Sequence, residues 1–119
     1  MIEFTILGQV KSDKNHMQIT RSGRHYPLPA FAKWRDDVIR QIDHINVLTF
    51  DKPCSIQFSY WKGNLIKRDV PGMIDAIFHV LEKAKFITDD SLFVNVHWLD
   101  MGLDKKNPRL KIIMNYERN

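Results

Sequence analysis

The chain of 119 residues has the size of one domain, and its 44% hydrophobic content argues against a disordered chain. Its formal net charge of +4 suits a polyanionic partner without identifying one. No hydrophobic run approaches the roughly 20 residues that span a bilayer, and the single Cys54 excludes an internal disulfide. We therefore expect one cytoplasmic domain over residues 1–119, without membrane contact.

The first half of the chain predicts a strand and a helix separated by a basic segment. Apolar and polar residues alternate at the start of 2–10, which is typical of a strand. Residues 11–28 are polar and basic and predict a loop or a loose hairpin. After Pro29, apolar side chains recur every three or four residues, which predicts a helix over 30–43. These side chains are Phe31, Trp34, Val38 and Ile42.

The second half predicts three strands and a second helix. Alternation at 54–60 indicates a strand with one buried face, and the apolar residues of 73–84 have helical spacing. Two further alternating segments, 92–98 and 110–116, predict strands joined by a hairpin loop over 102–108. The order β-α-β-α-β-β favours an α/β (α+β) domain with two helices on one face of a mixed four-stranded sheet.

Carboxylates frame the second helix. Asp69 precedes it, and the pair Asp89-Asp90 follows it. No Cys/His cluster has zinc spacing, so a metal would take carboxylate ligands, which suit Mg²⁺ or Mn²⁺. Such an ion activates water and neutralises phosphate charge. The structural alternative is that Asp69 caps the helix and Asp89-Asp90 form a turn.

The segment 67–90 resembles the core motif of the RusA-type Holliday junction resolvases, metal-dependent endonucleases that cut branched DNA. In that family an Asp-x-Asp-Asn motif opens a helix that carries a lysine and ends in Asp-Ala-Leu. An aromatic residue and an Asp-Asp pair follow. Here the matching residues are Asp69, Leu81, Phe86 and Asp89-Asp90. The N-terminal half also fits, through Gly8, Lys14, Gly23-Arg24, Tyr26 and Trp34-Arg35.

The chain departs from the family pattern at four positions. Pro71 stands in place of the second metal-binding aspartate, and Gly72 in place of the asparagine. Asp75 replaces the lysine, and His79 replaces the aspartate at the helix end. Either the site has been rebuilt, or this is a related protein without resolvase activity.

Helix geometry offers a rebuilt site. Positions 71 and 75 lie one turn apart on the same face, so Asp75 can supply the carboxylate that Pro71 lacks. His79 continues that face as a candidate acid/base group or a surface residue. The alternative for Asp75 is an ordinary solvated face, where its charge is favourable near the positive helix N-terminus.

The resemblance implies a homodimeric endonuclease that resolves Holliday junctions or other branched DNA in recombination and repair. It implies catalytic, metal-binding roles for Asp69 and Asp90, with Asp89 as a supporting ligand. The rebuilt site adds Asp75 as a third catalytic, metal-binding residue. Basic residues concentrate in two loops and favour phosphate contact, although they also suit solvated loops. They are Lys11, Lys14, Arg21, Arg24, Lys67 and Arg68. The alternatives are a catalytically silent RusA-like DNA-binding protein and a protein that binds a partner other than nucleic acid.

Overall fold

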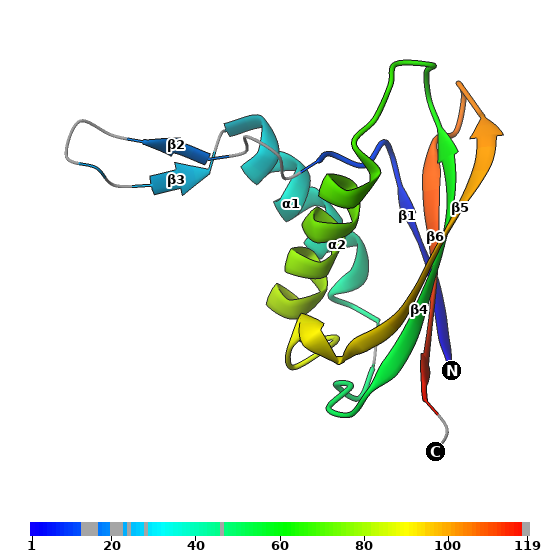
Figure 1. Cartoon of the computed structure of the whole chain (residues 1–119). Helices are drawn as coiled ribbons and strands as arrows, with labels where there is room; N and C mark the ends of the chain where they lie inside the picture. The colour runs from blue at the N-terminus through cyan, green and yellow to red at the C-terminus, as the bar shows by residue number, and fades with distance from the viewer. Residues whose placement is uncertain (13–16, 20–22, 24, 28, 46, 118–119) are drawn as a thin grey trace.

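The structure, a computed structural model, describes residues 1–12, 17–19, 23, 25–27, 29–45 and 47–117. It is a single domain with a four-stranded mixed sheet, two helices on one face of that sheet, and a short two-stranded hairpin set apart (Figure 1). The elements are β1 (Ile2–Leu7), β2 (Met17–Ile19), β3 (His25–Pro27), α1 (Pro29–Ile42), β4 (Cys54–Lys62), α2 (Val70–Lys83), the 3-10 turn η1 (Asp90–Leu92), β5 (Phe93–Leu103) and β6 (Arg109–Tyr116). The predicted α/β architecture and order are confirmed. The predicted loose hairpin is the antiparallel pair β2 and β3.

The strands of the large sheet follow the order β1-β6-β4-β5. β6 runs antiparallel to both β1 and β4, whereas β5 runs parallel to β4 along the sheet edge. The predicted hairpin over 102–108 is therefore wrong, because β4 lies between β5 and β6. The helical crossover through α2 returns the chain parallel to β4 on one side. The other side of β4 remains for β6.

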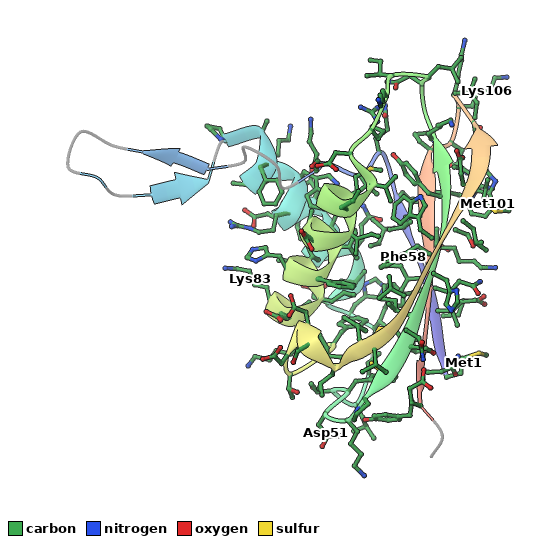
Figure 2. The ribbon with its side chains drawn as sticks, viewed as in Figure 1. Met1, Asp51, Phe58, Lys83, Met101 and Lys106 are labelled. Atoms are coloured by element: carbon green, nitrogen blue, oxygen red, sulfur yellow. The ribbon has the colours of Figure 1, made fainter. Side chains whose placement is uncertain are left out.

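The core lies between the two helices and the inner face of the sheet. β4 alternates as predicted, and its inward side chains from Cys54 to Tyr60 are at most 3% exposed. Figure 2 shows Phe58 between the sheet and the helices. α2 buries residues at helical spacing, namely Gly72, Met73, Ala76, Ile77, Val80 and Leu81. In the described part of the chain, no helix is long and apolar enough to cross a membrane.

The thiol of Cys54 belongs to this core. The side chain is 0% exposed at the start of β4, where it is paired with Phe93 on one side and Tyr116 on the other. Burial, followed by the negative charge of Glu117, raises the pKa of the thiol to about 11. Cys54 is therefore a protonated core residue.

The edge strand β5 differs from its predicted pattern. Its buried residue is Phe93, whereas Val94 and Val96 are 53% and 40% exposed. Trp98 packs inward, with its ring centroid 5.5 Å from those of Phe58 and Tyr60. Register shifts against β4 interrupt the alternation at both ends of the strand. An edge strand with such shifts does not keep one uniformly buried face.

Phe58 is the best single test of this packing, because its ring contacts both α2 and β5 through Phe78 and Trp98. We predict that Phe58→Ala lowers the free energy of unfolding by about 3–5 kcal/mol, through lost burial and the cavity that remains. Urea denaturation measures this change. Leu48→Ala is the matched control, because Leu48 is 92% exposed and its loss should stay within about 0.5 kcal/mol.

Candidate metal centre and basic loop

The end of α2 sets the position of the acidic residues that follow it. Lys85 adopts a left-handed conformation with φ 64°. The N–H of Lys85 then bonds to the carbonyl of Glu82, and that of Phe86 to the carbonyl of Leu81. This pair of bonds is a Schellman motif, which satisfies the last carbonyls of the helix. The chain next buries Phe86 and Ile87, at 3% and 1% exposure, before it returns to the surface.

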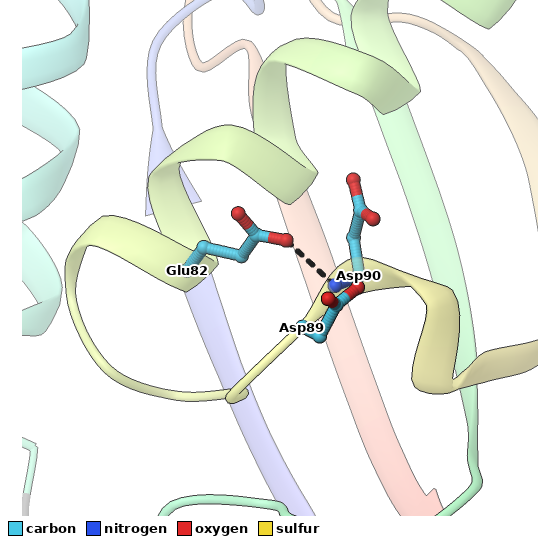
Figure 3. A group of neighbouring side chains, drawn as sticks. All are labelled: Glu82, Asp89 and Asp90. Carbon is cyan, nitrogen blue, oxygen red and sulfur yellow. Dashed lines mark hydrogen bonds between the residues drawn. The ribbon is translucent and has the colours of Figure 1, made fainter.

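Three carboxylates meet where the chain returns to the surface. Glu82, Asp89 and Asp90 each offer an oxygen within 4.8 Å of the others, and we call these residues the acidic group (Figure 3). The carboxylate of Glu82 accepts a hydrogen bond from the backbone N–H of Asp90, at 2.6 Å. Asp89 caps η1 by accepting one from the N–H of Ser91, at 2.8 Å. The turn predicted for Asp89-Asp90 is confirmed, and it holds the two side chains beside α2.

The acidic group carries unbalanced negative charge. The pKa of Asp90 is raised, first by burial and then by the charges of Glu82, Asp89 and Asp75. The pKa of Asp89 is lowered, mainly by the hydrogen bond from Ser91. Among the described residues, no lysine or arginine forms an ion pair with the group. A bound cation would relieve this repulsion, and all-oxygen ligands suit a hard divalent ion.

The other residues that the sequence predicts for the site lie outside the acidic group. Asp75 lies on the exposed face of α2, close enough for its charge to act on Asp90, yet outside the acidic group. His79 is exposed on α2, and its ring centroid is 6.5 Å from that of Phe31. Asp69 is also outside the group. It occupies the N-cap position of α2 without a side-chain capping hydrogen bond.

The carboxylate of Asp69 instead faces Ser12. Its Oδ2 accepts a hydrogen bond from the Ser12 hydroxyl at 3.4 Å. A side chain at Gly72 would place its Cβ 2.1 Å from the Ser12 Oγ and 2.5 Å from the Asp69 Oδ2. Glycine at position 72 therefore makes room for this contact. The capping alternative is right about the position of Asp69 and wrong about its hydrogen bond.

Sequence reasoning missed Glu82, although a signal was present. Glu82 lies seven residues after Asp75 and three after His79, so the polar face predicted for α2 extends one more turn. Only the turn at Lys85, however, brings Asp89 and Asp90 back against that face.

A basic pocket lies near the N-terminal end of α2. It has a volume of about 420 Å³ and brings Lys11 together with Lys67, Arg68 and Asp69. Lys11 and Lys67 are exposed, whereas Arg68 is half-buried. The Arg68 Nη2 donates to the side-chain oxygens of Gln9 and Asn64, and within the described part of the chain its buried Nε has no hydrogen-bond partner. The other predicted phosphate contacts, Lys14, Arg21 and Arg24, lie outside the described residues.

Comparison of the sequence with models of known protein families gave no match. Comparison with curated proteins gave no match either.

The repulsion around Asp90 predicts a stabilising substitution. Because its pKa is raised in the folded state, ionised Asp90 disfavours folding above that pKa, and the penalty disappears as pH falls below it. We predict that Asp90→Asn raises the melting temperature in EDTA at neutral pH, and that this advantage shrinks towards pH 4. Mg²⁺ should raise the melting temperature of the parent more than that of the variant.

Thermal unfolding followed by circular dichroism measures these differences. Asp43→Asn is the matched control, because Asp43 is exposed and lies outside the acidic group. An Asp90→Asn protein that melts below its parent in EDTA would contradict the repulsion.

Proposed function

We propose that this protein is a metal-dependent endonuclease that acts on Holliday junctions or other branched DNA in recombination and repair. The acidic group carries the proposal, because three carboxylates meet without a balancing cation among the described residues. The resemblance of Asp69 and Asp89-Asp90 to the RusA-type motif supports the substrate class.

The donor set fits Mg²⁺, with Mn²⁺ as an alternative, since every proposed ligand is a carboxylate. Glu82, Asp89 and Asp90 would hold the ion, with Asp75 beside them on α2. When bound, a divalent ion supplies an activated water and neutralises charge on the scissile phosphate. His79 lies between Asp75 and Glu82 along α2 and is the proposed group for proton exchange.

Phosphate binding is proposed for the basic pocket. Lys11, Lys67 and Arg68 concentrate positive charge beside the N-terminal end of α2, while the acidic group lies beside its C-terminal part. Backbone phosphates bound near the N-terminal end of the helix would orient the strand that is cut near its C-terminal end. Such contacts position DNA without reading its sequence.

The second candidate is a protein of the same fold that binds branched DNA without cutting it. One observation favours it, namely that Asp69 faces Ser12 and lies outside the acidic group. Such a protein would keep the basic pocket and lose the activity implied by the family motif.

A homodimer is part of the proposal, since paired nicks across a junction require two sites. β5 offers an interface, because it is an edge strand whose 11 residues include no lysine or arginine. Unprotected edges pair readily with another strand.

Figure 2 shows Met101 of β5 facing away from the helices. Five apolar side chains of β5 are 40–53% exposed, namely Val94, Val96, Leu99, Met101 and Leu103. Two copies related by a twofold axis would join β5 to β5 in one continuous sheet.

Cleavage of a labelled synthetic four-way junction tests the enzyme. We predict cleavage in Mg²⁺ and none in excess EDTA. Three variants should each bind junctions and cut them at least about 100-fold more slowly than the parent, namely Asp90→Asn, Glu82→Gln and Asp75→Asn. This is the effect of removing one electrostatic group from an active site. Asp43→Asn should cut at the parental rate.

The outcomes separate the two candidates. Binding without cleavage by the parent in Mg²⁺ would support the silent DNA-binding protein. Undiminished cleavage in EDTA would contradict the metal. Asp69→Asn tests the family-based assignment, because slow cleavage by this variant would extend the ligand set beyond the acidic group.

Light scattering at micromolar concentration tests the interface. We predict a mass near twice the 14.1 kDa of one chain, and a single-chain mass for Leu99→Lys, because a charge on β5 opposes strand pairing. Leu48→Lys should keep the parental mass. A parent of single-chain mass would exclude the dimer, and a Leu99→Lys dimer would place the interface elsewhere.

A further inference from the structure

Two adjacent aliphatic side chains stand out on the loop between β4 and α2. Leu65 is 76% exposed and Ile66 is 64% exposed. Their adjacency gives the loop a small apolar surface that a partner molecule could cover. Neither residue belongs to the acidic group or to the basic pocket. Both line a second pocket, of about 180 Å³, whose wall includes the aromatic side chains Tyr60 and Trp98.

The loop that carries this pair is held in place by side-chain hydrogen bonds. The Asn64 Oδ1 accepts from the backbone N–H of Ile66 at 3.1 Å and from the Arg68 Nη2 at 2.8 Å. Arg68 also donates to Gln9, which lies beyond β1. A Cβ at Gly63 would lie 3.0 Å from the Gln9 side chain, so the start of the loop packs closely as well. These contacts restrain the backbone on both sides of Leu65 and Ile66, while the two side chains remain exposed.

Positive charge adjoins the aliphatic pair. Lys67 follows Ile66 directly and forms no ion pair with any residue in the described ranges. Among the described residues, Arg68 donates hydrogen bonds to the neutral side-chain oxygens of Gln9 and Asn64 and to no carboxylate. Lys62, on the other side, is paired with Asp100 at 3.0 Å. Aliphatic side chains next to cations match a partner whose apolar surface lies beside phosphates, and a base step of DNA has this chemistry.

We infer that Leu65 and Ile66 form a wedge that inserts at a base step of bound DNA, while Lys67 and Arg68 contact the adjoining phosphates. Aliphatic side chains in DNA-bending proteins unstack base steps in this way. Unstacking is easiest where stacking is already interrupted, as at a branch point. The wedge would therefore favour branched DNA over linear duplex. The inference rests on the proposed DNA binding, but not on metal-dependent cleavage.

Fluorescence of 2-aminopurine placed at the branch point of a four-way junction tests the wedge. The measurement is made in EDTA, so that binding is observed without cleavage. We predict that the parent raises the fluorescence, because the probe brightens when it is unstacked. Leu65→Ser combined with Ile66→Ser should abolish the rise and weaken junction binding about tenfold. Its affinity for linear duplex should stay unchanged.

Two comparisons make the result specific. Leu48→Ser removes a side chain of equal size that is 92% exposed elsewhere, and it should leave fluorescence and affinity unchanged. The double variant should keep the parental slope of log affinity against log salt, because it removes no cation. Lys67→Gln should reduce that slope by about one phosphate contact.

The results that overturn the wedge are distinct. A double variant that binds junctions with the parental fluorescence would exclude insertion. A double variant that changes the mass in light scattering would assign the patch to contact between copies, since Trp98 and Asp100 of β5 line the same pocket. A parent that binds junctions without a fluorescence change would refute the wedge alone. A parent that binds no DNA would refute the proposed function as well.

Discussion

The burial of one face of α2 is the constraint on which the rest of the molecule depends. Because Ile77, Val80 and Leu81 are 0% exposed against the sheet, the opposite side of the helix is left to polar residues. The same burial draws Phe86 and Ile87 into the core directly after the helix ends. The chain can satisfy both demands only by reversing sharply. The proximity of the carboxylates in the acidic group is thus a consequence of core packing.

The two ends of α2 have opposite electrostatic characters. Cations gather near its N-terminal end in the basic pocket, although the helix dipole alone favours anions there. Carboxylates gather beside its C-terminal part, where the dipole favours cations. In the proposed function, the basic pocket would bind a phosphate at one end of α2 and the acidic group would bind a metal ion at the other. A helix arranged in this way is suited to holding a polyanion and a cation at the same time.

Much of the fold follows from local patterns in the sequence. The alternation of β4 and the helical spacing of α2 predict their buried residues, because central elements are covered by neighbours on a regular period. The strands that pair with β5 and β6 cannot be predicted from these patterns, since a loop over 102–108 permits either a hairpin or a connection past β4. Register shifts beside β4 also hide which side chains of β5 are buried. The pairing of Asp89 with Asp90 is visible in the sequence. The contribution of the third carboxylate, Glu82, depends on the left-handed conformation of Lys85. The sequence does not predict this conformation, because it is uncommon for residues other than glycine.

The buried Cys54 has a practical consequence. A thiol whose pKa is about 11 is almost entirely protonated at neutral pH, and thiolates are the species that react with maleimides and oxidants. The chain has no second cysteine. A cysteine introduced on the surface would therefore be the one fast-reacting thiol in the folded protein. Dyes and spin labels could be attached at a chosen position without first replacing Cys54. The packing where β4 adjoins β5 and β6 would then stay intact.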